Sequence, residues 1–189
     1  MTKAVIFDCF GVLYGGSLFA LLNMIPAERH QELIDLNKQN DYGYIDFSTY
    51  IEGVANILGK TAGEVTEIFA QKRVRNQLLF DYITRLRSEG VKIGLLTNAG
   101  RDMPSTLFTE SELNGELFDA YIVSSEEGIA KPNPEIYTLM ASKLGVPAGD
   151  CTMVDDTAEN CEGAEIAGMK SVWFTDTRTA IARLNEQLL

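Results

Sequence analysis

Five short apolar runs are spaced along the chain, and each is nearly continuous rather than alternating with polar residues. They are Ala4–Phe7, Val91–Leu96, Ala120–Val123, Cys151–Val154 and Ser171–Phe174. Continuous runs rich in Val, Ile and Leu are typical of strands that are buried on both faces, as in a parallel sheet. The pattern therefore predicts five parallel strands, and it places Trp173 in the core.

Helical periodicity fills most of the segments between these runs. Apolar residues recur at helical spacing from Leu78 to Leu86. Asn133 and Pro134 form a typical helix start, because Asn caps the first turn and Pro fits the first helical position. That helix is expected to end at Gly145, and further helices are expected over 158–167 and 177–189. The alternation of strands and helices indicates an α/β fold, a Rossmann-like doubly wound parallel sheet.

The alternation is interrupted between about Gly15 and Arg75. This stretch contains no clear strand and shows only helical stripes, one over Tyr50–Leu58 and another over Val65–Phe69. A helical excursion of this length after the first strand indicates an inserted α-helical cap domain. We therefore predict a core domain made of residues 1–14 and 80–189, with the cap at 15–79.

Composition and charge exclude several classes of protein. The 189 residues are 46% hydrophobic, and the net charge of −11 comes without any basic run that a nucleic acid would bind. Every apolar stretch is far shorter than the roughly 20 residues of a membrane span. Three cysteines without a CxxC pair suit a reducing compartment, and the single histidine argues against a histidine-rich metal site. We expect a cytoplasmic protein with a small-molecule partner and neither nucleic acid nor membrane; the sequence leaves the oligomeric state open.

Polar residues stand where four of the predicted strands end. They are Asp8, Thr97-Asn98, Ser124-Ser125 and Asp155-Asp156, and Lys131 follows in the loop after the third strand. Ligands of open α/β sheets bind at the carboxyl ends of the strands. Asp8 is thus a candidate nucleophile or metal ligand, while a nearby hydroxyl and lysine are suited to hold an anion. The paired carboxylates suit a hard cation such as Mg²⁺.

Four segments, taken in order, resemble the motifs of the haloacid dehalogenase (HAD)-like hydrolase superfamily. They are Phe7-Asp8-Cys9-Phe10-Gly11-Val12-Leu13, Leu95-Leu96-Thr97-Asn98, Lys131-Pro132-Asn133-Pro134 and Val154-Asp155-Asp156. Each motif is weak by itself, but the ordered set is specific. The helical insertion after the first motif matches the C1 cap of the family's subfamily I.

The resemblance implies a mechanism and a set of site residues. Asp8 would attack the substrate and form a covalent aspartyl ester. Thr97 would donate a hydrogen bond to a substrate oxygen, Asn98 would help to bind the substrate, and Lys131 would bind it and neutralise charge. The implied cofactor is Mg²⁺, with Asp8, the Phe10 backbone carbonyl, Asp155 (directly or through water) and Asp156 as ligands.

The chain departs from the family pattern at Phe10. Family phosphatases usually carry a second aspartate there, which protonates the leaving oxygen and later deprotonates the attacking water. General acid–base catalysis typically contributes ~10²–10⁴-fold in rate. Hydrolysis of ordinary alkyl phosphates is therefore expected to be impaired, unless an acid from the cap substitutes. The cap offers Glu28, Glu32, Asp35, Asp41, Asp46 and Glu52, and the sequence does not choose among them.

Three hypotheses about function follow. The first is a Mg²⁺-dependent hydrolase of a small phosphorylated metabolite, with atypical acid–base catalysis and a leaving group that needs little protonation, such as an acyl or aryl phosphate. The second is a non-catalytic HAD-fold binding or scaffold protein. The third is a metal-independent 2-haloacid dehalogenase, in which an aromatic residue occupies the position of Phe10 and a cap arginine such as Arg29 binds the substrate carboxylate. The Asp155-Asp156 pair favours the metal-dependent hydrolase.

Overall fold

The five predicted strands form one parallel sheet. The computed structural model describes residues 2–188, so Met1 and Leu189 of the predicted core domain lie outside the described residues. The strands β1 (Ala4–Phe7), β2 (Lys92–Thr97), β3 (Ala120–Val123), β4 (Cys151–Asp155) and β5 (Lys170–Trp173) are arranged in the order β3-β2-β1-β4-β5. All four pairings are parallel, and the observed ends of the strands lie within one residue of the predicted ones.

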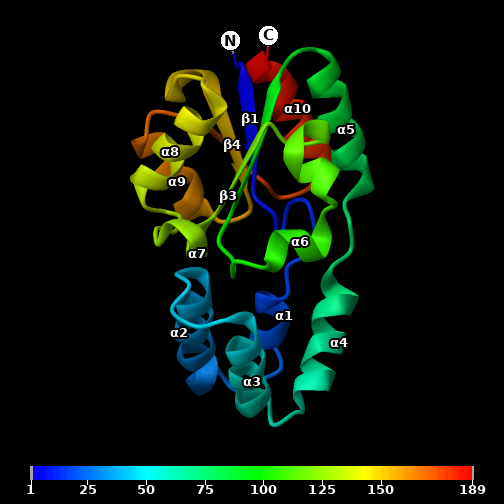
Figure 1. Ribbon diagram of the computed structural model, residues 1–189, viewed down its shortest axis with the longest axis vertical. Helices are drawn as coiled ribbons and strands as arrows, with labels where there is room; N and C mark the ends of the chain where they lie inside the picture. Colours follow the sequence, from blue (N-terminus) through cyan, green and yellow to red (C-terminus); the bar gives the residue numbers. More distant parts are fainter. Residues whose placement is uncertain (1, 189) are drawn as a thin grey trace.

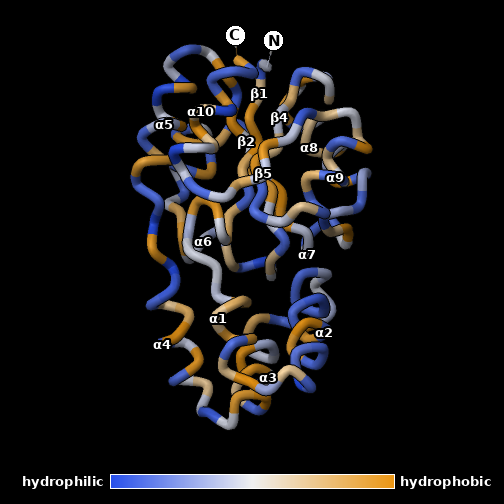
Figure 2. Tube along the Cα trace, turned by 180° about the vertical axis from the view of Figure 1, so that it is seen from behind, coloured by the Kyte–Doolittle hydropathy of each residue, from blue (hydrophilic) through white to orange (hydrophobic). Residues whose placement is uncertain are grey.

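Helices cover both faces of the sheet, which confirms the doubly wound Rossmann-like fold (Figure 1). Helices α5 (Gln77–Ser88) and α10 (Thr177–Leu188) pack on one face, and α8 (Pro134–Leu144) and α9 (Ala158–Ile166) pack on the other. Successive strand residues point to opposite faces, so Val5 and Phe7 join the first layer while Ala4 and Ile6 join the second. Both faces are buried, and the hydrophobic positions concentrate along the strands (Figure 2). This explains why the runs are continuous.

Helix α8 begins and ends as its sequence predicts. The Asn133 side chain accepts a hydrogen bond from the backbone N–H of Glu135, and Pro134 is the first helical residue. Gly145 ends the helix in the left-handed conformation, with φ of +65°. The other short helical segments are η1 (Ala27–Arg29), α6 (Met103–Leu107), η2 (Glu112–Glu116), α7 (Ser124–Glu127) and η3 (Ala148–Asp150).

Four helices form a layer of their own beyond the carboxyl ends of the strands (Figure 1). They are α1 (Leu18–Leu22), α2 (His30–Asp41), α3 (Phe47–Leu58) and α4 (Ala62–Lys72). Their inward residues, among them Leu33, Val54 and Val65, make a hydrophobic cluster separate from the two clusters of the sheet. The helical insertion therefore has its own core and covers the edge of the sheet where ligands bind.

The two connections between the cap and the sheet run side by side. The backbone N–H of Gly15 donates to the carbonyl of Val74 at 3.1 Å, and that of Asn76 donates to Leu13 at 2.9 Å. Leu79, in the next helix, already packs in the cluster of the sheet. The predicted boundary between residues 79 and 80 stays a prediction, and we propose that the chain leaves the cap a few residues earlier, at 73–76.

The prediction that Trp173 lies in the core is wrong. Its side chain is 51% exposed, and its Nε1 donates a hydrogen bond to the backbone carbonyl of Asp156 at 2.9 Å. The reason is that β5 is an edge strand in which only Val172 is fully buried, whereas every residue of β4 is buried. Among the described helices, none combines the length and the apolar character needed to cross a lipid bilayer.

Helix α9 approaches the loop after β3 so closely that a glycine is required in its middle. A Cβ atom at Gly163 would collide with the backbone carbonyl of Pro132, whereas one at Gly63, which is exposed in α4, would meet nothing closer than 3.9 Å. We expect Gly163→Ala to lower the free energy of unfolding by about 1–3 kcal/mol, as overpacking does. Gly63→Ala should raise it by about 0.5–1 kcal/mol, because alanine favours helix. Denaturant unfolding of the two variants measures both changes, and equal stabilities would contradict the close contact.

Candidate active site

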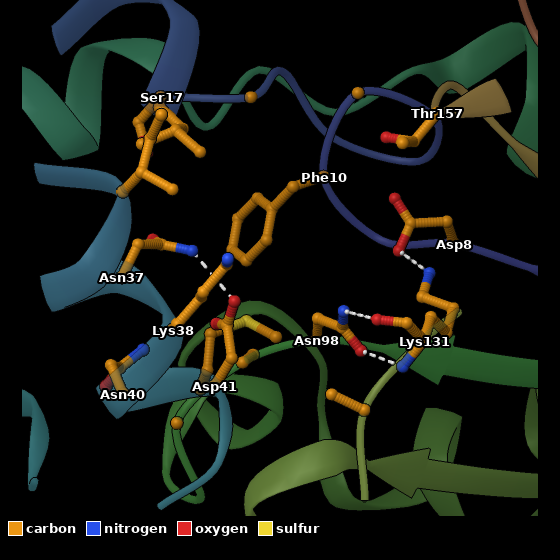
Figure 3. Close-up of a pocket in the computed structure, with 18 of the residues that line it drawn as sticks. Asp8, Phe10, Ser17, Asn37, Lys38, Asn40, Asp41, Asn98, Lys131 and Thr157 are labelled. Carbon is orange, nitrogen blue, oxygen red and sulfur yellow. Dashed lines mark hydrogen bonds and ion pairs between the residues drawn. The ribbon is translucent and has the colours of Figure 1, made fainter. Parts of the chain in front are cut away.

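A cavity of ≈ 1000 Å³ lies between the carboxyl ends of the strands and the cap. Asp8 and Lys131 line it from the core, and Asn37 and Asp41 line it from helix α2 (Figure 3). Asp156 lines it from the core as well. Asp8 follows β1 and Asp156 follows β4, two neighbouring strands whose connections leave in opposite directions. This point of an open α/β sheet is where ligands bind.

Lys131 holds two carboxylates on the floor of the cavity. Its Nζ donates to Asp8 Oδ1 and to Asp155 Oδ2, both at 2.6 Å. All three side chains are buried: Lys131 is 4% exposed, Asp8 is 7% exposed and Asp155 is fully buried. An ammonium group carries three N–H donors, so one donor of Lys131 is not used by these two bonds.

Asn98 fixes the backbone of this lysine. Its Oδ1 accepts from the Lys131 N–H and its Nδ2 donates to the Lys131 carbonyl, each at 2.9 Å (Figure 3). Both ends of the amide are therefore engaged, although Asn98 also lines the cavity. The geometry gives Asn98 a positioning role beside the predicted contact with substrate.

Both carboxylate oxygens of Asp155 accept hydrogen bonds from other residues of the protein. Its Oδ2 receives Lys131, and its Oδ1 accepts from the backbone N–H of Thr157 at 3.0 Å and from Asn160 Nδ2 at 2.9 Å. Asp155 does not line the cavity, whereas Asp156 does. The two adjacent carboxylates thus differ: Asp155 positions Lys131, and Asp156 faces the space where a ligand would lie.

Asp156 comes close to the loop that follows Asp8. Gly11 has a φ of +92°, and a Cβ atom there would overlap the Asp156 carboxylate. One oxygen from each of Asp8, Asp155 and Asp156 lies within 4.8 Å of the other two. The structure therefore brings together the three carboxylates that the sequence proposed as metal ligands.

The charges of this cluster do not balance. When all three carboxylates are ionised they carry −3 and Lys131 carries +1, which leaves −2 at a site where Asp8 and Asp155 are buried and Asp156 is exposed. Burial raises the pKa of Asp8 to about 7 against the opposing charge of Lys131. Burial, with the charge of Asp155, also raises the pKa of Asp156. For Lys131, burial favours a lower pKa, but Asp155 and Asp8 overcome it and raise the pKa above its usual value.

These residues fit a divalent cation. An excess charge of −2 matches Mg²⁺, which prefers carboxylate and carbonyl oxygens. Within the described part of the chain, the backbone carbonyl of Phe10 accepts no hydrogen bond, so its oxygen is available as a ligand. Asp8 and Asp156 line the same cavity beside it.

Thr97 ends strand β2 and is fully buried. Its Oγ1 has no hydrogen-bond partner among the described residues, and Thr97 does not line the cavity. A buried hydroxyl without a partner is rare in folded proteins. In the pairing of β1 with β2, Thr97 lies one residue past the position opposite Asp8. Its unpaired hydroxyl is therefore suited to a ligand oxygen that reaches the end of β2.

The sequence missed how the cap contributes to this site. Of the six acidic cap residues that it offered, Asp41 lines the cavity, while Asp46 caps helix α3 and Glu32 pairs with Arg29. Asp41 enters the site because α2 docks on the end of β3, where Ser124 Oγ donates to the Asp41 carbonyl. No local sequence signal encodes that tertiary contact. Other cavity residues that the sequence did not single out include Asn37, Lys38, Asn40 and Arg73.

Comparison with known proteins identifies the class. The family model of haloacid dehalogenase-like hydrolases matches residues 2–168, so the chain belongs to this family and the resemblance seen in its motifs is confirmed. Human N-acylneuraminate-9-phosphatase is 35% identical over 128 residues, which cover 65% of this chain and 50% of that protein. The chain spans about half the length of such curated phosphatases.

Solved structures share the fold over nearly the whole chain. A predicted HAD-like family hydrolase from Porphyromonas gingivalis superposes with a TM-score of 0.77 at 21% identity, covering 100% of this chain and 98% of that one. A HAD family enzyme from Bacteroides thetaiotaomicron, solved as a magnesium complex, gives a TM-score of 0.69 at 21% identity, covering 90% and 92%. The α/β core and the helical cap therefore have the architecture of a HAD-like hydrolase.

Removing the lysine should expose the cost of the buried carboxylates. We expect Lys131→Met to lower the free energy of unfolding by about 3–5 kcal/mol in metal-free protein, because two buried carboxylates lose their shared counter-charge. Lys143→Met is the matched control, since Lys143 pairs with Glu127 at the surface and such pairs contribute about 0–1 kcal/mol. Adding Asp8→Asn to Lys131→Met should recover part of the loss in denaturant unfolding. A double variant less stable than Lys131→Met would contradict this account.

Proposed function

We propose that this protein is a Mg²⁺-dependent phosphatase that hydrolyses a small phosphorylated metabolite through Asp8. The observation that carries the proposal is the carboxylate of Asp8, held by Lys131 at the floor of a capped cavity and close to Asp156. Phosphatases among the relatives support the reaction class, although they match only part of their own length. A cavity of ≈ 1000 Å³ suits a small-molecule partner.

The proposed reaction begins at the free oxygen of Asp8. Lys131 engages Oδ1, so Oδ2 attacks phosphorus, and the bond from phosphorus to the leaving oxygen breaks. The product is an aspartyl phosphate on Asp8, which water then hydrolyses to inorganic phosphate and free carboxylate. The spare N–H of Lys131 and the hydroxyl of Thr97 donate to phosphoryl oxygens as their charge develops.

The proposed metal ligands are Asp8, the Phe10 carbonyl and Asp156. Asp155 holds Lys131 and Asn160 and acts on a metal only through its neighbours or a water molecule. When bound, Mg²⁺ supplies the positive charge that lets a phosphate dianion approach the Asp8 carboxylate. The chain's own part is to orient Asp8, to exclude bulk water with the cap, and to position Lys131.

The two alternative functions make different demands on the site. A haloacid dehalogenase needs a cap arginine at the substrate. Arg29 does not meet this demand, because it donates to the Ile57 carbonyl, pairs with Glu32 and does not line the cavity, whereas Arg73 at the end of α4 does line it. A metal-independent reaction would also not need the excess charge of −2 that the three carboxylates and Lys131 give the site. A purely binding role would give the buried Asp8–Lys131 pair no reaction to catalyse.

A reducing compartment such as the cytoplasm stays our expectation, because the three buried cysteines are free thiols.

Mg²⁺ binding tests the metal site without any substrate. Calorimetric titration should detect binding to the native protein, and Asp156→Asn should weaken it by at least the ~10–100-fold typical of losing even an indirect contact. Asp150→Asn is the control, because Asp150 pairs with Lys3 at the far end of β4. Unchanged affinity in Asp156→Asn would remove Asp156 from the proposed ligands.

Hydrolysis assays test the reaction. With Mg²⁺, the protein should release phosphate from acetyl phosphate or p-nitrophenyl phosphate, and both Asp8→Asn and chelation by EDTA should abolish this activity. Chloride release from 2-chloropropionate without metal, lost in Asp8→Asn, would instead establish the dehalogenase. Neither activity across a panel of phosphorylated metabolites, together with retained ligand binding, would establish the binding protein.

A further inference from the structure

We propose that Asp41, from the cap, is the general acid–base of this site and takes over the part that Phe10 cannot perform. The inference rests on the proposed phosphatase function and deepens it. It assigns a second catalytic carboxylate on helix α2, across the cavity from Asp8. It also widens the substrate class to alkyl phosphates, whose leaving alcohols need a proton.

The first argument is that Asp41 is held against the core. It is the last residue of α2, and its carbonyl accepts a hydrogen bond from Ser124 Oγ at the start of α7, directly after β3. Two residues later the chain passes so close to α7 that a Cβ atom at Gly43 would lie 2.7 Å from the Ser125 carbonyl. These contacts fix the end of α2 against the carboxyl edge of the sheet, which is the edge that carries Asp8.

The second argument is that the Asp41 side chain is directed into the cavity and is not neutralised by an ion pair among the described residues. Asn37 Nδ2 donates to Asp41 Oδ2 at 2.8 Å, which orients the carboxyl group (Figure 3). Among the described residues, no ion pair involves Asp41. The Phe10 ring points from the opposite loop toward the same part of the cavity, so Asp41 approaches the space that Phe10 leaves without a proton donor.

The third argument concerns the surroundings that set its protonation. The charged and titratable groups around Asp41 are Lys38 on its own helix, Lys131 across the cavity and Tyr50 from α3, while α7 contributes the hydroxyls of Ser124 and Ser125. Burial raises the pKa of Asp41 to about 7, and Lys131 and Asn40 oppose that rise. A group that is half protonated near neutral pH can both give and take a proton, as this reaction requires.

The chemistry balances with one proton. As Asp8 Oδ2 bonds to phosphorus and the bond to the leaving oxygen breaks, the proton of the Asp41 carboxylic acid passes to that oxygen and an alcohol leaves. The resulting Asp41 carboxylate then takes a proton from water, whose oxygen bonds to phosphorus as the bond to Asp8 breaks. Inorganic phosphate departs, and Asp8 and protonated Asp41 are restored.

A pair of substrates of nearly equal size tests this role. p-Nitrophenyl phosphate releases a phenolate that needs no proton, whereas p-nitrobenzyl phosphate releases an alcohol that needs one. With Mg²⁺, we expect Asp41→Asn to lower the single-turnover rate on the benzyl ester by ~10²–10⁴-fold. The rate on the phenyl ester should fall less than about tenfold, because no proton is transferred in its first step. Single-turnover cleavage of the phenyl ester also reports that the variant folds and binds.

The matched control is Asp35→Asn, the same change on an exposed position of α2 that does not line the cavity. It should leave both rates unchanged. Equal losses on the two esters in Asp41→Asn, or no loss on the benzyl ester, would overturn the role of Asp41. A native protein that cleaves only the phenyl ester would overturn it too, while leaving the proposed phosphatase in place. A native protein that cleaves neither ester would overturn both proposals.

Discussion

The site depends on a single ammonium group that is shared by two buried carboxylates. Lys131 Nζ reaches Asp8 after β1 and Asp155 after β4, and so it joins the two strands at the switch point of the sheet. Asn98 holds the backbone of Lys131 from β2, and Thr157 and Asn160 hold Asp155 from the start of α9. Asp8, Lys131 and Asp155 are therefore oriented by one another through this shared ion pair. A buried pair of this kind contributes little net stability, but it is severely destabilising when one partner is removed.

The core could be derived from sequence because its signals are local. Apolar runs mark strands that are buried on both faces, and Asn133, Pro134 and Gly145 mark the ends of a helix by their own side chains and backbone preferences. The polar residues at the strand ends could be found for the same reason, since parallel strands bring their carboxyl ends to one edge. The order of the strands then decides that Asp8 and Asp156 become neighbours.

What could not be derived depends on contacts between distant segments. The six acidic cap residues named as candidates look alike in sequence, and only the docking of α2 on Ser124 distinguishes Asp41. The difference between Asp155 and Asp156 arises from the turn into α9, which supplies donors to one carboxylate and leaves the other facing the cavity. The exposure of Trp173 follows from the position of β5 at the edge of the sheet, which no apolar run reveals.

The twin connections between cap and core are hydrogen-bonded to each other at Gly15–Val74 and Leu13–Asn76, so they would bend together as one double-stranded hinge. Because the proposed nucleophile stands on one side of this hinge and the proposed proton donor on the other, opening it would break the contacts of the end of α2 with Ser124 and Ser125 and would separate the catalytic pair. A ligand too small to hold the cap shut would thus meet an incomplete set of groups. Only a substrate large enough to keep the cap closed would then meet the complete site. Closure of the cap would thus contribute to selection among substrates by size.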